Sequence, residues 1–164
     1  MSEAAPEPGL VEPDWLGACG NLVQAVYRYW RSKARAGRLP RRSDIDPTEI
    51  PRLLSHLMIV EVVEDERRYV YRLVGTKEVE MRGRDPTGLS VIDAFLGISV
   101  EDALWHYDQT VTTRAPVHDD KPYVSTSGRW VSDDTLFLPL SEDGIRIDRI
   151  LVAAAAEPYP KTRR

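Results

Sequence analysis

Tyr69-Val-Tyr-Arg-Leu-Val-Gly-Thr-Lys-Glu-Val-Glu-Met-Arg-Gly-Arg-Asp-Pro-Thr-Gly88 is the stretch from which the organisation of the whole chain can be read. Its first half alternates and is rich in aromatic and β-branched residues, which predicts a strand over about residues 69–75. Its second half is broken by Gly83, Asp85-Pro86 and Gly88 and can form only short helical turns. The short helices that follow the strand can cover one face of the sheet, so we expect this stretch to form a pocket wall.

The residues on both sides of this stretch complete a pattern of strands and helices. Residues 57–63 form a β-branched run, and the charged residues 64–68 turn it into the strand at 69–75 as a hairpin. Downstream, a helical turn is predicted at residues 90–95 and a helix at residues 99–113. Three further strands, joined by tight turns, are predicted at residues 121–126, 129–138 and 145–156. We therefore expect an α+β fold, in which a five-stranded antiparallel sheet carries short helices on one face, together with a leading N-terminal helix.

The sequence before the first strand predicts a leading helix. Residues 1–13 contain three prolines and three glutamates and are expected to be a disordered leader. From Asp14 to Ala36 apolar residues recur at intervals of three and four, which defines one apolar stripe on a long helix that Gly37 ends. Because this stripe must be buried, the helix is expected to dock on the domain or on a second copy of the chain. The candidate dimer contacts on the stripe are Trp15, Leu22, Val26, Tyr29 and Trp30.

Composition places the chain among ordinary globular proteins. Its 164 residues predict one domain, 42% of them are hydrophobic and 29% are charged. No apolar run is long enough for a membrane span, and the N-terminus lacks the features of a signal peptide, so we expect a cytoplasmic location. Cys19 is the only cysteine, which excludes an intramolecular disulfide and a cysteine-based zinc cluster. The net charge is −4, yet residues 15–43 carry seven basic side chains and no acidic one. Such a patch suits either the C-terminal end of an amphipathic helix or an anionic partner.

The order of two strands, short helices, a longer helix and three strands resembles that of the PAS domain. Four sequence segments are similar to the small bacterial proteins of PAS family 5: Trp30-Arg31, residues 39–47, Tyr71-Arg-Leu-Val-Gly-Thr76 and Gly83-Arg-Asp-Pro-Thr-Gly88. The resemblance covers about residues 20–155. It implies a PAS-like domain at residues 56–156, preceded by a helical extension at 14–55 and followed by a flexible tail at 157–164. It also implies a sensory or interaction module whose ligand, in most members, is unassigned.

The known cofactor chemistries of PAS domains find little support in these residues. The flavin photosensors and the cinnamoyl photoreceptors need a cysteine on the helical side, and no cysteine follows Cys19. A haem PAS uses a histidine on the helix before the third strand, where His106 lies. However, His106 is about 120° from the centre of the apolar face, at 100° per residue, so we interpret it as a surface histidine near the rim. The cofactor is therefore unknown.

Metal and enzyme motifs are also missing from the sequence. His56 and His118, the latter beside Asp119-Asp120, are typical of polar turns before strands, and no metal site is predicted. No nucleophile elbow, phosphate loop, dinucleotide fingerprint or zinc-protease motif occurs. The adjacent acidic pairs Asp133-Asp134 and Glu142-Asp143 are interpreted as solvated strand ends and a turn. We therefore predict no catalytic residue.

One charged residue and several large apolar ones are candidates for a pocket between helices and sheet. Arg72 would need an anion if it lay on the covered face of its strand, and alternation places it opposite Tyr71 without saying which face is covered. The candidate ligand-binding residues are Arg72, Met81, Phe95, Tyr107, Trp130 and Phe137. A pocket lined by these side chains would be mostly hydrophobic, and so would a filled core.

These observations favour a non-catalytic, PAS-type sensory or regulatory module that binds a small ligand or a partner protein of a signalling pathway and forms a homodimer through its leading helix. A purely structural dimerisation or adaptor domain with a filled core is the first alternative. The second is a small α+β enzyme with a cone-shaped pocket, which would gain support if Asp93 or His106 were buried against the pocket. Nucleic-acid binding through residues 28–42 is a weaker possibility.

Overall fold

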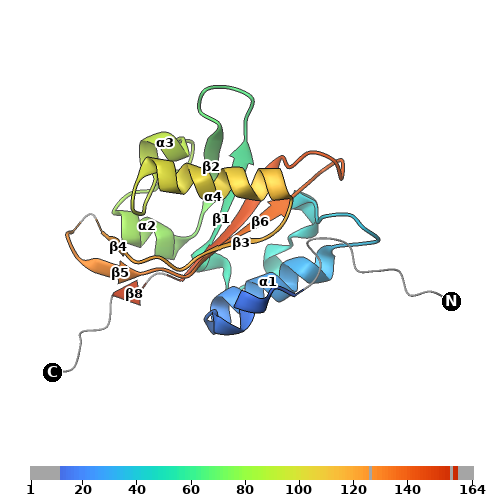
Figure 1. The fold of residues 1–164 in the computed structure, drawn as a ribbon, viewed down its shortest axis with the longest axis horizontal. Helices are drawn as coiled ribbons and strands as arrows, with labels where there is room; N and C mark the ends of the chain where they lie inside the picture. The colour runs from blue at the N-terminus through green and yellow to red at the C-terminus, as the bar shows by residue number, and fades with distance from the viewer. Residues whose placement is uncertain (1–11, 126, 156, 159–164) are drawn as a thin grey trace.

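The computed structural model describes residues 12–125, 127–155 and 157–158, and its centre is a five-stranded antiparallel sheet (Figure 1). The strand order is β2-β1-β7-β6-β3. The strands are β1 (Leu57–Val62), β2 (Tyr69–Val74), β3 (Val117–Asp119), β6 (Thr135–Leu140) and β7 (Arg149–Ala154). The predicted α+β class, the hairpin of the first two strands and the antiparallel five-stranded sheet are confirmed.

Three helices cover one face of this sheet: α2 (Thr76–Arg82), α3 (Val91–Ala94) and α4 (Val100–Thr113). Ser90 and Ser99 cap α3 and α4, because each hydroxyl accepts a backbone N–H three residues on. Gly75, between β2 and α2, packs so closely on the preceding segment that an added Cβ would lie 2.4 Å from the carbonyl oxygen of Ser55. Glycine at this position therefore lets the chain pass directly from strand to helix.

The short helices lie on one face, as predicted, and the leading helix covers the opposite face of the sheet. The predicted single helix from Asp14 to Ala36 is wrong, because the chain forms a 3₁₀ helix, η1 (Asp14–Ala18), and a separate α1 (Asn21–Lys33). Gly20 is extended and joins the two, and Ala34 ends α1 in an extended conformation. Trp30 of α1 is fully buried and its indole Nε1 donates to the carbonyl oxygen of Pro139 at 2.9 Å.

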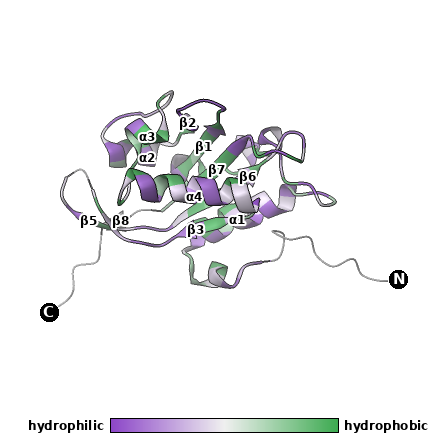
Figure 2. Cartoon of the chain, turned by 45° about the horizontal axis from the view of Figure 1, so that its top comes forward, coloured by the Kyte–Doolittle hydropathy of each residue, from purple (hydrophilic) through white to green (hydrophobic). Residues whose placement is uncertain are grey.

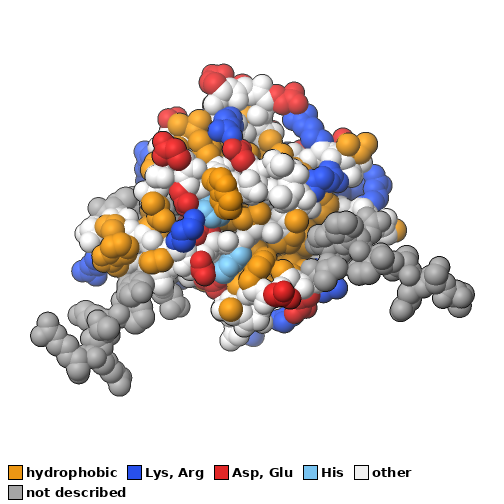
Figure 3. All heavy atoms as spheres, in the orientation of Figure 1, with side chains coloured by type: hydrophobic (Ala, Val, Ile, Leu, Met, Phe, Trp, Pro, Cys, Tyr) orange, Lys and Arg blue, Asp and Glu red, His pale blue; other side chains and the backbone are white. Residues whose placement is uncertain are grey.

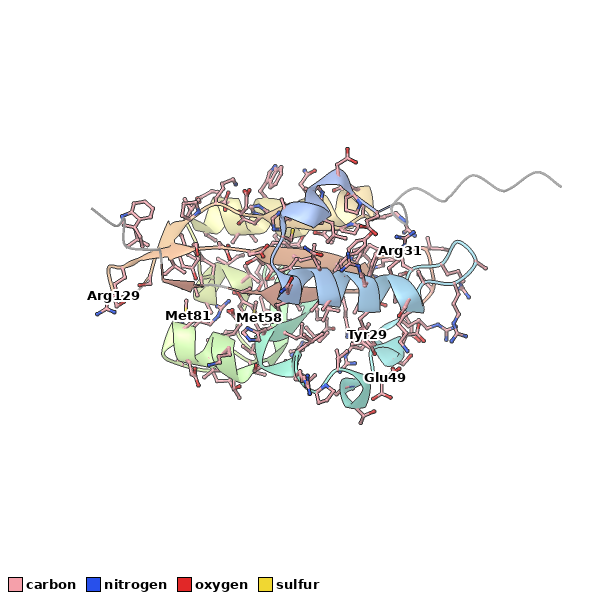
Figure 4. All side chains as sticks on the ribbon, turned by 90° about the horizontal axis from the view of Figure 1, so that it is seen from below. Tyr29, Arg31, Glu49, Met58, Met81 and Arg129 are labelled. Atoms are coloured by element: carbon pink, nitrogen blue, oxygen red, sulfur yellow. The ribbon has the colours of Figure 1, made fainter. Side chains whose placement is uncertain are left out.

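Three 3₁₀ turns connect α1 to the first strand: η2 (Arg42–Asp44), η3 (Pro47–Glu49) and η4 (Leu54–His56). Asp46 caps η3, since its carboxylate accepts the N–H of Thr48 at 2.9 Å. The Tyr29 hydroxyl donates to Glu49 at 3.0 Å and so ties α1 to η3, as Figure 4 shows with both residues labelled.

The strands after α4 differ from the prediction. The edge strand of the main sheet is β3, before the predicted strand at 121–126, and the predicted strand at 129–138 is divided at Asp133-Asp134. Adjacent carboxylates disfavour a continuous strand, and both side chains are engaged in hydrogen bonds elsewhere. A small three-stranded sheet consists of β4 (Tyr123–Val124), β5 (Trp130–Ser132) and β8 (Glu157–Pro158). The start of the predicted flexible tail is therefore paired in a strand, while residues 159–164 and residues 1–11 of the predicted leader lie outside the described residues.

Side-chain alternation in the sheet produces two cores, one on each face. Figure 2 shows that hydrophobic residues are frequent along the strands between α4 and α1. In β6, Leu136 and Leu138 pack in the cluster that includes α1, whereas Phe137 packs in the cluster that includes α4. All six residues of β6 are buried, as expected for a strand covered on both faces.

Candidate functional site

A cavity of about 50 Å³ lies between the helices and the sheet. Side chains of α2 and α4 form its walls, β1, β2, β6 and β7 contribute its floor, and Asp119, Tyr123 and Asp133 close the remaining side. Its ionisable lining residues are Tyr71, Glu78, Arg82, Asp102, His106, Tyr107, Asp119, Tyr123 and Asp133. Acidic and histidine side chains gather at the surface between α4 and β3 (Figure 3). Apolar side chains make up much of the lining, as expected, but the number of charged groups at the pocket was not predicted.

His106 is buried in this cavity and is only 2% exposed, so its interpretation as a surface histidine is wrong. The buried residues of α4 are His106, Tyr107 and Thr110, of which Tyr107 belongs to the predicted apolar face and the other two are polar residues outside it. A hydrogen bond from the Thr110 hydroxyl to the His106 carbonyl, at 2.8 Å, lets this polar residue lie in the interface. Apolar periodicity alone gave the wrong rotation of the helix because polar residues occupy part of its buried face.

The imidazole of His106 is held in one orientation. Nδ1 lies 2.7 Å from the carbonyl oxygen of Asp102, and because a carbonyl oxygen only accepts, Nδ1 is the donor. Nε2 points toward Asp119, with its nearest carboxylate oxygen at 3.5 Å. The ring stacks on Phe137 with a centroid distance of 5.4 Å and meets the edge of Trp105 at 4.9 Å. In the neutral ring, therefore, Nε2 presents a lone pair to the cavity.

Two residues of α2 form a buried ion pair beside the cavity. The Arg82 Nε lies 3.5 Å from a carboxylate oxygen of Glu78, and the two side chains are 8% and 5% exposed. Arg82 Nη1 donates to the carbonyl of Ala94, and its guanidinium carbon lies 4.7 Å from the centroid of the Tyr71 ring. Nε itself has no hydrogen-bond partner among the described residues. Burial raises the pKa of Glu78, and the neighbouring Arg82 opposes this effect.

Asp133, interpreted from sequence as a solvated strand end, instead lines the cavity. Burial raises the pKa of its carboxyl group to about 7, the hydrogen bond from Thr135 opposes this change, and the negative charges of Asp119 and Glu78 add to it. The Thr135 hydroxyl donates to Asp133 Oδ1 at 2.5 Å. The cavity thus contains a carboxyl group that exchanges its proton near neutral pH.

The structure brings two of the six candidate ligand-binding residues, Tyr107 and Phe137, to the cavity. Arg72 is exposed on the face opposite Tyr71 and forms an ion pair with Glu61, which places it away from the cavity. Trp130 is 59% exposed on the small sheet, so the expectation that it packs between helices and sheet is wrong.

The other two candidates are half-buried beside the site. Phe95 packs against the core on the helix side. Met81, labelled in Figure 4, lies at a separate, more open hollow together with His56.

Sequence reasoning did not single out most of the charged residues at the cavity, namely Glu78, Arg82, Asp102, Asp119 and Asp133. Two signals were available, because Glu78–Arg82 and Asp102–His106 are both spaced i, i+4 and must therefore share a helix face. What the sequence did not contain was the rotation of each helix against the sheet. Asp93, considered as a possible buried group, is exposed.

A second polar cluster, on the α1 side, consists of Cys19, His118 and Asp134. His118 Nε2 lies 2.6 Å from Asp134 Oδ1 and 3.4 Å from Cys19 Sγ, and the other Asp134 oxygen accepts the N–H of Gly20 at 2.8 Å. Thiol and carboxylate share one ring nitrogen, so the imidazole cannot relay a proton between them as in a catalytic triad. Burial, with the nearby acidic groups, raises the pKa of the Cys19 thiol to about 11, which makes it a poor nucleophile.

The predicted dimer contacts lie mainly on surfaces that the fold itself covers. Val26 and Trp30 are fully buried against the sheet. Trp15 stacks on the ring of His118 at a centroid distance of 5.0 Å, and Leu22 and Tyr29 are half-buried against the same core. The apolar stripe of α1 therefore serves to dock the helix on its own domain.

This arrangement is that of a PAS domain. It has an antiparallel sheet with β2 and β3 at its edges, and the segment between these two strands forms the short helices and the longer helix on one face. A cavity lies between those helices and the sheet. The chain matches the family described as "PAS domain", PAS family 5, over residues 21–153. It belongs to this family, and PAS domains are typically sensory modules of signalling proteins. The matched region includes α1, so the leading helix is part of what the family shares.

Solved structures with the same fold are distant in sequence. The PAS domain of the fruit-fly ELK potassium channel is 8% identical, with 68% of this chain and 94% of that chain covered and a TM-score of 0.52. A light-oxygen-voltage domain described in work with a flavin analogue is 8% identical, with 67% and 82% covered and a TM-score of 0.50. At this identity they show the fold alone. None of the curated proteins matches the sequence. None of the helices in the described part of the chain has both the length and the apolar character that a membrane span requires.

Proposed function

We propose that the protein is a non-catalytic sensory or regulatory PAS module that binds a small polar ligand in the cavity between α2, α4 and the sheet, and passes the signal to a partner protein in the cytoplasm. The observation that supports this most directly is the set of buried charged side chains around unfilled space. Moving charges out of water costs several kcal/mol per group unless they are well paired, so a domain needed only for its shape would gain stability from an apolar core.

The charges also restrict the kind of ligand. Four carboxyl groups, those of Glu78, Asp102, Asp119 and Asp133, line the cavity, whereas Arg82 is its only lining lysine or arginine among the described residues. A cavity with this balance favours a cation or a molecule rich in hydrogen-bond donors. Its free volume of about 50 Å³ limits the buried part of the ligand to a few non-hydrogen atoms.

Native mass spectrometry of freshly purified protein, with and without cavity-filling substitutions, tests this proposal. Ala103 lines the cavity, so Ala103→Leu fills it, whereas Val111→Leu adds bulk to the same helix away from the lining. We expect an adduct on the wild type and on Val111→Leu that Ala103→Leu loses. A wild type without any adduct, and without a thermal shift in a screen of small amines, polar metabolites and cations, would instead support an adaptor domain with no ligand.

A second function, a small acid–base enzyme, is favoured by the burial of His106. The imidazole of His106 and a carboxyl group of pKa about 7 line the same cavity, which is a combination that general base and general acid catalysis use. The ligand recovered from the wild type and from His106→Asn separates the two functions. A sensor returns the ligand unchanged from both proteins, while an enzyme converts it in the wild type only.

A further inference from the structure

We propose that the cavity holds a divalent transition-metal or zinc ion, bound by Asp102, His106 and Asp119; this inference rests on the proposed function, in which the cavity is the ligand site. One ligand atom of each residue lies within 4.8 Å of the other two, which is the separation that a single ion can bridge. The three residues come from two elements that pack on each other, α4 and β3.

The positions of the three residues follow from the fold. Asp102 and His106 are one helical turn apart and therefore project from the same face of α4. Asp119 is the last residue of β3, where it pairs with Thr135 of β6. Because α4 runs across β3 and β6, the carboxylate of Asp119 lies opposite the imidazole.

The hydrogen bonding of His106 provides an independent reason. Its Nδ1 donates to the Asp102 carbonyl oxygen, and in the neutral ring this leaves the Nε2 lone pair directed at an Asp119 carboxylate oxygen 3.5 Å away. Two acceptors face each other in a buried site, and no hydrogen bond joins them. Metal-binding histidines show this arrangement, in which one nitrogen donates to a backbone carbonyl and the other is free for the ion. A cation between Nε2 and the carboxylate turns a repulsive contact into two attractive ones.

The carboxyl groups around the proposed ion outnumber the cationic side chains beside them, so a divalent cation is electrostatically favourable there. Lys121 Nζ lies 2.9 Å from Asp102 Oδ1, but its side chain is 51% exposed and can move aside, and Asp102 Oδ2 faces His106. Asp133 and Glu78 contribute two more carboxyl groups to the lining of the same cavity. One imidazole and two carboxylates suit Mn²⁺, Fe²⁺ or Zn²⁺ better than soft ions, which prefer sulfur. The free volume beside them accommodates the waters that complete the coordination.

The second cluster of possible metal ligands, Cys19, His118 and Asp134, differs because its histidine is already hydrogen-bonded to a carboxylate. His118 Nε2 is 2.6 Å from Asp134, a distance at which it donates a hydrogen bond, and that carboxylate is further bound by a backbone N–H. Its polar atoms are satisfied without an ion, so it provides the control for the experiment.

The test uses the full chain, without a histidine tag and after treatment with EDTA. Titration calorimetry with Zn²⁺ and Mn²⁺, and visible absorption with Co²⁺, are measured for the wild type and for Asp119→Asn, Asp102→Asn, Cys19→Ser and Asp134→Asn. We expect one ion per chain, weakening of at least about tenfold in Asp119→Asn and Asp102→Asn, and unchanged binding in the other two. Circular dichroism confirms folding, and either of the two cavity variants is sufficient if the other does not fold.

Three results overturn this inference. The first is the absence of binding at millimolar ion, the second is binding that both cavity variants retain, and the third is a sulfur-to-cobalt charge-transfer band that Cys19→Ser removes. If the metal result is negative and native mass spectrometry still shows an organic adduct that Ala103→Leu loses, the metal inference fails while the proposed sensory function stands. If both are negative, both fail.

Discussion

Replacing Asp133 by asparagine should stabilise the metal-free protein above neutral pH. The carboxyl group has an ordinary pKa of 3.8, and burial raises it to about 7 in the folded chain. The folded state therefore binds this proton more tightly than the unfolded state, so stability is highest at acidic pH and falls as the pH rises from about 4 to 7. Asparagine carries no charge to desolvate, and its amide oxygen can still accept the hydrogen bond of Thr135.

The size of the effect follows from the two pKa values. Their difference corresponds to about 4 kcal/mol at pH values above both, since each pKa unit is equivalent to about 1.4 kcal/mol. Asp133 is not fully buried, so solvent screens part of its charge, and we expect a gain of about 2 kcal/mol at pH 8. At pH 4 the carboxyl group is protonated in the folded state, and the two proteins should have nearly equal free energies of unfolding.

Urea unfolding at pH 4, 6 and 8, in EDTA at the two higher values, measures this difference. Asp143→Asn is the matched control, because the Asp143 carboxylate accepts two backbone N–H groups in an exposed turn, which lower its pKa. Its substitution should cost stability above about pH 4 and have little effect below, which is the opposite dependence. A difference between Asp133→Asn and wild type that does not change with pH, or a wild type that is the more stable at pH 8, would refute the assignment of Asp133 as a buried, proton-binding group.

Three further substitutions or reactions test the packing. Trp30→Phe should lower the free energy of unfolding by about 1–3 kcal/mol, because it leaves the buried carbonyl of Pro139 without its hydrogen-bond donor. The control Trp130→Phe, at an exposed position, should change the free energy of unfolding by less than about 0.5 kcal/mol in the same urea titration. Gly75→Ala should destabilise the fold by more than about 1 kcal/mol, because the added Cβ clashes with the backbone of Ser55. Gly17→Ala is the control, since its Cβ meets no atom within 4 Å. Equal melting temperatures for the two variants would contradict the close approach of Gly75 to Ser55. The Cys19 thiol, with its pKa raised to about 11, should react with Ellman's reagent only after unfolding, and a fast reaction of the native protein at pH 8 would contradict its burial.

Features with strong local signals could be predicted from the sequence. The hairpin of β1 and β2 follows from two β-branched runs around a charged turn, and α4 follows from its serine cap and its periodic residues. The interruption of the leading helix at Cys19-Gly20 and the division of the strand at Asp133-Asp134 were missed, because both depend on partners that are distant in sequence. The Gly20 N–H bonds to Asp134, more than a hundred residues away.

The candidate site was less predictable than the fold for a related reason. Apolar periodicity placed the centre of the buried face of α4 near Tyr107, which is buried, but it excluded His106 next to it. A polar residue can occupy a buried face when its hydrogen bonds are satisfied locally, and those of His106 and Thr110 are made within the same helix. Residue type alone gives no indication of this.

The short strand β3 connects the candidate site to the leading helix. Neighbouring residues of a strand point to opposite faces, so Asp119 lines the cavity while His118 contacts Trp15 and Cys19 at the start of the helical segment on the other side. β3 is only three residues long and lies at the edge of the sheet, where β6 is its single neighbouring strand. An edge strand of this length is held by few ladder hydrogen bonds, so a ligand that draws Asp119 toward α4 displaces β3 more readily than any central strand. Such a displacement would change the contact of His118 with Trp15 of η1, so β3 physically connects the two covered faces of the sheet.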